Sequence, residues 1–406
     1  MNFLKPWQMD SALMVNKVLN LDKTSWKLTK VGDLAKDISK RVDNPGESEY
    51  DRFVGLGNFV SGDVKIKTWE TTENLESSAK AFKAGDILFA RRNAYLRRAS
   101  LVDFDGCCSG DAFVLRENHD KIVPGFLAFL MNSNALWDYA NSNAAGTMSK
   151  RVKWRDLAEY KFLLPPKDQQ AQLAKLLWAM DEVIEKERKS ANQILVNKRV
   201  LLDELCKVEI VTPKRLSDFI EIRNGYAFKG KNIVNEEADR ILMTPGNFKI
   251  GGGFSFDKMK YYNSDDVKPE FIFNTGDMVI TMTDLSKDGD TLGYPAIIPE
   301  VNGKTILHNQ RLGKVLFKND ELEFKFLYYL LQTPKYRKHI LNAATKTTVR
   351  HTYSKRITGY KFNFLNLSEQ AIWVSRFSSL DNTHSEFKSK ITASRNLQKS
   401  LINQIF

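Results

Sequence analysis

The chain has 406 residues, with 61 Lys and Arg against 49 Asp and Glu and a net charge of +12. This length allows two or three domains with cores of their own, and the charge favours a polyanionic partner whose phosphates Lys and Arg neutralise. The three cysteines form no Cys-x-x-Cys pair that could hold zinc. No apolar run reaches the length of a membrane span and no secretory signal opens the sequence, so we expect a cytoplasmic protein with reduced cysteines.

The first globular segment, residues 1–163, reads as a mixed α/β domain. In KAGDILFARRN, Gly85-Asp86 supplies a turn and the apolar run behind it supplies a buried strand. Farther along, GFLAFLMNSNALWDYA has the apolar spacing of helices with one buried face. Short strands, turns and helices together predict an α+β class for this segment.

Residues 164–208 predict a long helix. It should begin after Pro165-Pro166, with Asp168 as its N-cap, and no Gly or Pro follows up to Lys207. About 40 residues at about 1.5 Å each give a helix of about 60 Å. Apolar residues fall at heptad spacing on two lines, which Glu187 and Lys198 interrupt: Leu173, Met180, Ile194 and Leu201, and Leu177, Ile184, Ala191 and Leu205.

Residues 209–363 and 364–406 repeat this order of a mixed domain and a long helix. The second helix has apolar lines interrupted by His384, Ser394 and Gln398: Trp373, Leu380, Phe387 and Leu401, and Phe377, Ile391 and Ile405. A single apolar stripe must be buried, so we expect the two helices to pack as an antiparallel coiled coil. The alternative, that each is an ordinary core helix of its own domain, conflicts with their length.

An internal repeat supports this division. Tyr160-Lys161-Phe162 recurs as Tyr360-Lys361-Phe362, and the same separation relates Gln170 to Gln370 and Asp181 to Asp381. Upstream the separation shrinks steadily, for example between Gly85-Asp86 and Gly276-Asp277. The separations between chance matches would scatter. We therefore interpret the chain as two diverged copies with small insertions in the second, related by a pseudo-two-fold axis.

Basic clusters in both copies are the candidate binding residues. The globular segments carry +3 and +6 of the net charge of +12, which places the expected polyanion on them. Arg can make two hydrogen bonds to guanine, and Asn can make two to adenine. Hydroxyl groups mixed with cations suit contacts to phosphates and base edges. The expected DNA contacts in the first copy are Arg91, Arg92, Asn93, Tyr95, Arg97, Arg98, Thr147, Ser149, Lys150, Arg151 and Lys153. Those in the second copy are Lys346, Thr347, Thr348, Arg350, His351, Tyr353 and Lys355.

Motifs for catalysis are missing from the sequence. It has no phosphate-cradling GxxxxGK[ST] loop, and Gly55-Leu56-Gly57 lacks the third glycine of a dinucleotide fingerprint. It has no Asn/Asp-Pro-Pro-aromatic motif of an amino-methyltransferase, and its five histidines lack metal-ligand spacing. We therefore expect no catalytic residues, no bound metal and no cofactor in this chain.

Four features together resemble the specificity subunits of type I restriction–modification systems. They are GDILFARRN, GTMSKRVKWRDLAEYKFLLPP, the helix opening KDQQAQLAKLLWAMDEVIEKE, and their counterparts in the second half. The segment with LPP, Gln-Gln and a long helix with an early Asp is the most specific of these. The second copy departs from it, reading NFLNLSEQ where the family usually shows prolines.

The resemblance implies two target recognition domains, each reading one half of a split site on double-stranded DNA, with two antiparallel helices that set the distance between the halves. It also implies that two modification subunits, which bind S-adenosylmethionine and methylate adenine, dock on the chain and that motor-nuclease restriction subunits join them. The alternatives are a coiled-coil scaffold whose repeated modules bind proteins, and a fused methyltransferase, which conflicts with the missing motifs.

Overall fold

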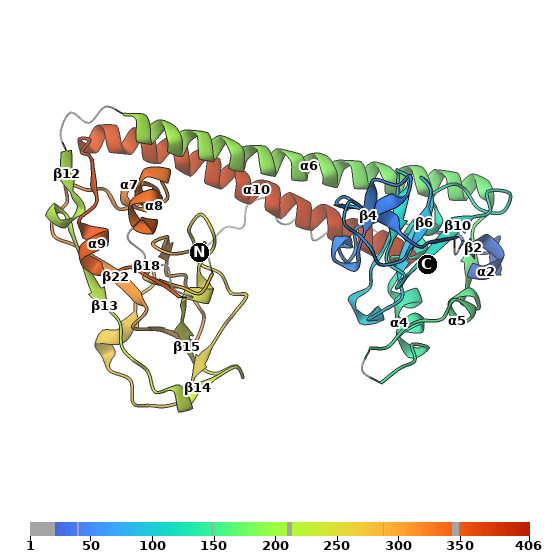
Figure 1. Cartoon of the computed structure of the whole chain (residues 1–406), viewed down its shortest axis with the longest axis horizontal. Coiled ribbons are helices and arrows are strands. Elements are labelled where there is room, and N and C mark those ends of the chain that lie inside the picture. Colours follow the sequence, from blue (N-terminus) through green and yellow to red (C-terminus); the bar gives the residue numbers. More distant parts are fainter. Residues whose placement is uncertain (1–20, 39, 148, 209–212, 287, 343–348) are drawn as a thin grey trace. The chain divides into compact units, whose positions relative to one another are not determined.

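The computed structural model describes residues 21–406 except 39, 148, 209–212, 287 and 343–348. By its internal contacts the chain divides into two compact units (Figure 1). Unit 1 comprises the described residues up to Ser190 together with Phe387–Phe406, and unit 2 comprises those of Ala191–Glu386. Each unit therefore contains an α/β domain and part of each of two long helices.

The described strands of unit 1 form three sheets. A two-stranded antiparallel sheet pairs β1 (Lys27–Lys30) with β11 (Lys161–Leu164). A four-stranded antiparallel sheet has the order β2 (Ala35–Asp37), β10 (Ala112–Glu117), β7 (Ile87–Ala90) and β8 (Ala99–Leu101). A five-stranded sheet has the order β3 (Lys40–Val42), β6 (Ala79–Phe82), β9 (Gly106–Cys108), β4 (Arg52–Val54) and β5 (Glu70–Thr71), with β4 and β9 parallel.

Unit 2 repeats this plan. The pair β12 (Pro213–Arg215) and β24 (Lys361–Asn363) matches β1 and β11. A four-stranded sheet has the order β13 (Ile220–Asn224), β22 (Leu312–Phe317), β18 (Met278–Thr281) and β20 (Pro295–Ile297). A five-stranded sheet has the order β14 (Ile233–Val234), β16 (Tyr261–Tyr262), β15 (Arg240–Met243), β21 (Thr305–His308) and β17 (Ile272–Phe273). A short pair joins β19 (Thr283–Asp284) to β23 (Arg350–His351).

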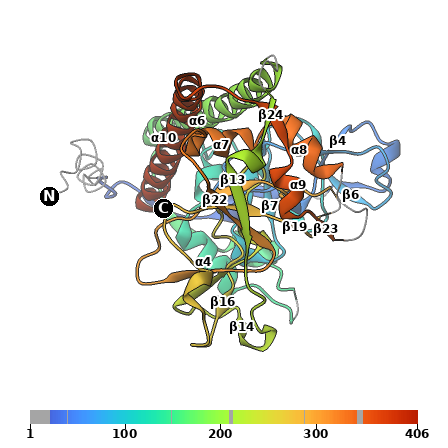
Figure 2. The ribbon, with the colours of Figure 1, turned by 90° about the vertical axis from the view of Figure 1, so that its left-hand side faces the viewer.

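Short helices recur in both units. In unit 1 they are α2 (Val31–Leu34), α3 (Leu127–Leu130), α4 (Asn134–Ser142) and α5 (Trp154–Ala158), and in unit 2 they are α7 (Phe324–Leu330), α8 (Pro334–Leu341) and α9 (Ser354–Thr358). A hydroxyl cap divides each of the two apolar stretches into two helices. Ser133 accepts from the Leu136 amide and begins α4 after α3, and Thr333 accepts from the Tyr336 amide and begins α8 after α7. Figure 2 shows α9 beside β13, against which it packs.

The Gly-Asp turns precede a central strand in each four-stranded sheet, as the sequence indicates. Gly85 and Gly276 have φ of 91° and 89°, a left-handed conformation that favours glycine. Asp86 accepts from the Lys83 amide at 2.8 Å, and Asp277 accepts from the Asn274 amide at 2.8 Å. The matching turns and helices and the matching order of the two four-stranded sheets confirm that the chain is an internal repeat of two α/β domains.

The long helices are α6 (Lys167–Lys207) and α10 (Leu367–Ile405). They pack antiparallel: in unit 1 the Gln398 amide donates to the Leu177 carbonyl at 3.2 Å, and in unit 2 Lys198 pairs with Asp381 at 2.7 Å. Ser394 donates to Glu187 at 3.1 Å in the same way. Four of the polar residues that interrupt the apolar lines, Glu187, Lys198, Ser394 and Gln398, thus meet polar groups on the facing helix. The expected antiparallel pair of long helices is confirmed.

Both helices also enter the domain cores. The core of unit 1 includes Leu173 and Leu177 of α6 and Ile402 of α10, while that of unit 2 includes Leu205 of α6 and Phe377 of α10. Two helices alone cover only a narrow seam, so the domain helices bury much of each apolar stripe. The apolar lines therefore serve the coiled coil and the domain cores together.

The two long helices begin differently. The Pro166 carbonyl accepts the Gln170 amide at 2.9 Å, so Pro166 occupies the cap position and Asp168 lies in the first turn instead of capping it. In the second copy, Asn366 and Glu369 each accept the other's backbone amide, at 3.0 and 2.9 Å. This reciprocal capping box replaces the prolines.

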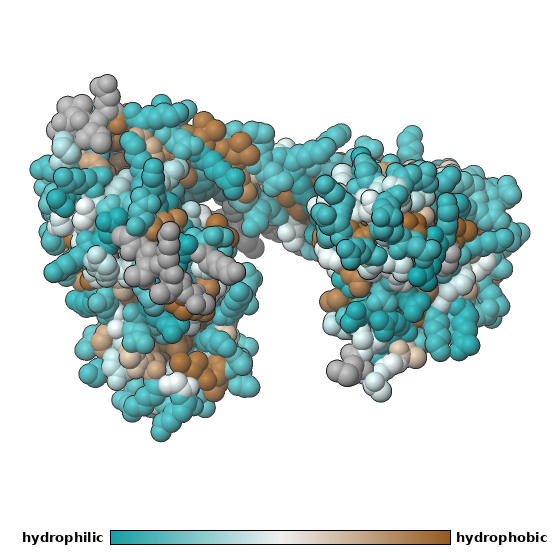
Figure 3. Space-filling model, in the orientation of Figure 1, coloured by the Kyte–Doolittle hydropathy of each residue, from teal (hydrophilic) through white to brown (hydrophobic). Residues whose placement is uncertain are grey.

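Part of α6 leaves apolar side chains uncovered. In unit 2, Leu195, Val196 and Val200 are 41%, 49% and 52% exposed, and Figure 3 shows hydrophobic residues gathered over this part of α6. In unit 1, Leu176 and Val183, seven residues apart, are 42% and 48% exposed. None of the helices in the described part of the chain combines the length and apolar character needed to cross a bilayer.

Candidate nucleic-acid interface

The structure joins the two basic clusters of the first copy into one surface. The chain that leaves β7 runs beside the segment before α5: the Val152 amide donates to the Arg91 carbonyl at 2.9 Å, and the Asn93 amide to the Lys150 carbonyl at 3.0 Å. Arg92 and Arg151 face each other in an antiparallel bridge. Residues about 60 positions apart in the sequence therefore form a single cationic edge on unit 1.

Asp111 organises the cations of this edge. Its carboxylate accepts from Arg151 Nε at 2.8 Å and Nη2 at 3.2 Å, and it lies 3.6 Å from Arg92 Nη1. The hydrogen bond from Arg151 lowers the pKa of Asp111 despite partial burial, and the charges of Arg151, Arg91 and Arg92 lower it further. Sequence analysis missed Asp111, because its role depends on the pairing of β7 with β10.

The members of this edge differ in exposure. Arg92 is exposed and donates from Nε to Ser149 Oγ at 2.7 Å. Arg91 is half-buried, with its guanidinium 5.5 Å from the centre of the Phe113 ring. Four other expected contacts are exposed, namely Thr147, Lys150, Lys153 and Tyr95. The Tyr95 residue is 69% exposed.

Arg97 and Arg98 are engaged by other parts of unit 1. Arg97 donates to Asn134 Oδ1 at 2.9 Å and to Asp138 Oδ1 at 2.7 Å, both on α4. Arg98 donates to the Leu56 carbonyl at 2.8 Å, and burial lowers its pKa. Both guanidinium groups therefore hold the loop that follows β7 against the domain.

Unit 2 has the same junction with different side chains. The strand β19, which follows the central strand β18, pairs with β23 before α9, so that Thr283 faces His351 and Asp284 faces Arg350. Thr283 Oγ1 lies 3.0 Å from His351 Nδ1. Tyr353 is 60% exposed and Lys355 is exposed, while the predicted contacts Lys346, Thr347 and Thr348 lie outside the described residues.

Asp284 is a second site residue that sequence analysis missed. It is 6% exposed and accepts from the Ser286 amide at 2.7 Å and from Thr291 Oγ1 at 2.7 Å. Burial raises the pKa of this carboxyl, but the hydrogen bonds from Ser286 and Thr291 outweigh it and hold the pKa below its ordinary value. Asp284 therefore closes the loop that follows β19. It lies seven residues after Asp277, as Asn93 lies seven residues after Asp86, so the repeat aligns Asp284 with Asn93.

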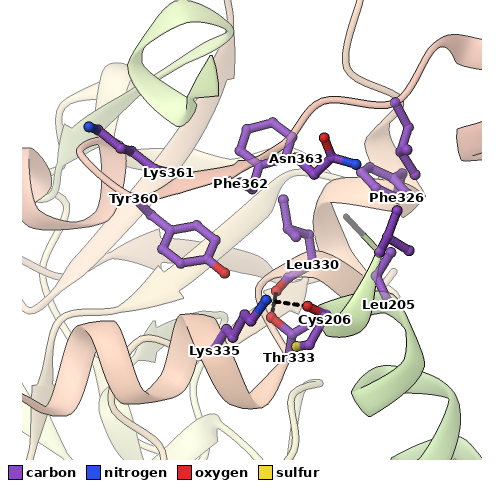
Figure 4. Close-up of a pocket in the computed structure, with 12 residues that line it drawn as sticks. Leu205, Cys206, Phe326, Leu330, Thr333, Lys335, Tyr360, Lys361, Phe362 and Asn363 are labelled. Atoms are coloured by element: carbon purple, nitrogen blue, oxygen red, sulfur yellow. Dashed lines mark hydrogen bonds between the residues drawn. The ribbon is translucent and has the colours of Figure 1, made fainter. Parts of the chain in front are cut away.

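A small apolar pocket lies in unit 2 at the end of α6 (Figure 4). Its volume is about 40 Å³, and Lys335 reaches across it to donate to the Cys206 carbonyl. This lysine satisfies a carbonyl at the negative end of the helix dipole. Among the described residues, no group of three His, Cys, Asp or Glu side chains is placed to hold a metal ion.

Comparison with known proteins places these features in one family. Residues 23–195 and again 209–394 match the type I restriction modification DNA specificity domain. The type I restriction enzyme MjaVIII specificity subunit of Methanocaldococcus jannaschii is 22% identical over 314 residues, covering 70% of this chain and 72% of that protein. The EcoDI specificity subunit of Escherichia coli is 24% identical over 181 residues, 43% of this chain and 40% of that protein.

Solved structures share the fold. A chain from a study of the assembly and conformational transition of a type I restriction–modification system has a TM-score of 0.57 at 19% identity, covering 94% of this chain and 97% of that one. The type I S subunit from M. genitalium has a TM-score of 0.52 at 13% identity, covering 96% and 98%. The chain therefore belongs to the DNA specificity subunits of type I restriction–modification systems, a family of non-catalytic DNA-recognition subunits without a cofactor of their own.

Proposed function

We propose that the chain reads a split site on double-stranded DNA through the junction that recurs in both units. In this proposal residues 1–163 and 209–363 are the two target recognition domains, and residues 164–208 and 364–406 are the spacer helices between them. The observation that carries it is the pairing of the segment after the central strand with the segment before α5 or α9. In unit 1 this pairing gathers Arg92, Ser149 and Lys150 on one edge.

The two junctions present different chemistry, which suits two different half-sites. The first offers Arg92, Asn93 and Lys150, which can donate to guanine O6 and N7 or pair with adenine and phosphates. The second offers the exposed His351 and Lys355 and the half-buried Arg350, while Thr283, only 3% exposed, contacts the His351 ring from below the surface. Because Arg350 can also donate to guanine, the expected difference is the adenine contact of Asn93, which the second half-site does not reproduce.

We also propose that two methyltransferase subunits dock on the long helices, that restriction motor-nuclease subunits join them, and that the complex works with DNA in the cytoplasm. The exposed apolar side chains of α6 support the docking. Leu176 and Val183 in unit 1, and Val196 and Val200 in unit 2, lie in uncovered positions of an otherwise packed helix. Apolar side chains at heptad or four-residue spacing are those that a partner helix covers.

A salt-titrated DNA-binding measurement tests the reading surface. With the chain assembled with its methyltransferase subunits, Arg92→Ala should weaken binding to the cognate duplex by about 1–3 kcal/mol if the contact is bidentate to a base. Lys150→Ala, as a phosphate contact, should weaken all duplexes alike and reduce the salt slope by about one. Lys121→Ala removes an exposed charge outside the junction and controls for net charge. Unchanged affinity in both junction variants would overturn the assignment.

A further inference from the structure

One short turn of unit 1 has an unusual backbone. Ala94–Leu96 form a single 3₁₀ turn directly after the cationic edge. The residues on either side, Asn93 and Arg97, have φ of 54° and 48°. Side chains with a Cβ rarely adopt this left-handed conformation, so the surrounding contacts must hold the turn in place.

Those contacts come from three directions. Ala94 is 2% exposed and belongs to the core of unit 1. The Asn93 amide donates to the Lys150 carbonyl at 3.0 Å, and Arg97 donates twice to α4, at 2.9 and 2.7 Å. Helix α4 is itself fixed to α10, because the Asn134 amide donates to Asn403 Oδ1 at 2.7 Å. These contacts therefore hold the turn in a fixed position relative to α10, one of the two long helices.

The turn presents large side chains to solvent. Tyr95 is 69% exposed and Leu96 is 39% exposed, although the residue before them is buried in the core. The turn follows the exposed Arg92 in the sequence, and Asn93 at its start is hydrogen-bonded to the backbone of the exposed Lys150. Ordering an aromatic side chain on a flexible loop would reduce binding affinity, and here the fold has already ordered the backbone beneath it.

We propose that Tyr95 is a base-stacking wedge: its ring enters the base stack of the first half-site and partly unstacks one step. The proposal rests on the proposed function of the junction and adds the role of this side chain. Wedges of this kind require rigid support, because unstacking a step pushes back on the inserted side chain. Stacking on an aromatic ring also tolerates any base, so Tyr95 would fix the register of the half-site rather than its sequence.

The segment of unit 2 that matches this turn is not expected to insert an aromatic ring. No aromatic residue occurs in the sequence between Asp284 and Tyr294, the segment that follows β19. Among its described residues, Leu285 is 66% exposed. An aromatic wedge at this turn is therefore predicted for the half-site read by unit 1, and the matching segment of unit 2 has no aromatic side chain to repeat it.

Fluorescence of 2-aminopurine, which rises when the base unstacks, tests this directly. The analogue is placed in turn at each position of both half-sites, except the adenines that the methyltransferase subunits flip, and the assembled complex is added. The wild-type complex should raise the fluorescence about threefold or more at one step of the first half-site. Tyr95→Ala should abolish this rise and weaken binding about tenfold, a loss within the range for one stacked base, while Tyr95→Phe should preserve both.

The controls separate this proposal from the one it rests on. Leu28→Ala removes a side chain that is 67% exposed on β1 and should leave fluorescence and affinity unchanged. If Arg92→Ala weakens binding while Tyr95→Ala leaves affinity and fluorescence as in the wild type, the junction reads DNA and the wedge is wrong. If neither variant alters binding, the reading surface itself is wrong. A rise that persists in Tyr95→Ala would also overturn the wedge.

Discussion

Replacing Asp63 with alanine should break the ionic contact that holds the first domain to both long helices. Asp63 lies in the domain with its side chain 6% exposed. Arg188 of α6 donates to both of its carboxylate oxygens, at 3.0 and 2.9 Å, and Lys67 donates at 2.9 Å. Arg395 of α10 binds the same carboxylate. One carboxylate thus binds three cations from three segments of unit 1, two of which also pair with Glu185 of α6.

The size of the effect follows from burial. Removing one partner of a fully buried pair costs about 3–5 kcal/mol, because the remaining charge is left without a partner. Here the cations are 23%, 26% and 36% exposed, so water can solvate them in part and the expected loss is about 2 kcal/mol. In a unit of this size such a loss lowers the unfolding temperature by about 4–8 °C.

The pKa of Asp63 predicts how this loss depends on pH. Burial raises the pKa, but hydrogen bonds from Arg188 and Lys67 outweigh it, so the pKa is lower in the folded chain than in the unfolded chain. The stabilisation is then complete above the unfolded value near about 4 and disappears as pH falls through the lower folded value. The difference between wild type and Asp63→Ala should therefore be constant from about pH 8 to 5 and shrink below pH 4.

Differential scanning calorimetry across this pH range measures the effect. Asp51→Ala is the matched control, because the Asp51 side chain is 86% exposed and 3.9 Å from its arginine partner. It should change stability by less than about 0.5 kcal/mol. An Asp63→Ala loss as small as the control, or one that grows toward acid pH, would refute the reasoning.

Three further predictions follow from buried groups and from the missing catalytic motifs. Burial lowers the pKa of His308 to about 4, so unit 2 should lose up to about 3 kcal/mol as pH falls from about 6.5 to 4, and His308→Gln should flatten that slope in chemical denaturation. Gln170 and Gln370 fix the starts of α6 and α10 by accepting from the Val123 and Glu323 amides at 2.9 and 2.7 Å, so leucine at either position should cost about 1–3 kcal/mol, measurable as a lower urea midpoint. The purified chain without partners should neither methylate nor cut DNA, and transfer of a labelled methyl group by that sample would contradict its assignment as a non-catalytic subunit.

Local sequence patterns were sufficient to predict most of the fold. Gly85-Asp86 and Gly276-Asp277 specify a turn with left-handed glycine, and the strands that follow are read from their apolar runs. The start of α10 was harder to place, because it uses the Asn366–Glu369 capping box in place of prolines. That motif was readable in the sequence as Asn-Leu-Ser-Glu.

The candidate site was predictable only in part. Composition and repetition pointed to both basic clusters, but their meeting depends on a pairing between Arg92 and Arg151 that no local pattern encodes. Asp111 joins the site through long-range strand pairing for the same reason. Arg97 contacts α4 from a left-handed backbone at a residue other than glycine, which no local sequence pattern predicts.

Methylome sequencing of a host that expresses the chain with its methyltransferase subunits tests the central claim most directly. The wild-type chain should direct methylation to a motif with two specified halves separated by unspecified bases. The double variant Arg92→Ala, Lys150→Ala should relax or abolish recognition in one half and leave the bases of the other unchanged. A continuous motif, or a change in both halves, would contradict the assignment of one half-site to each domain.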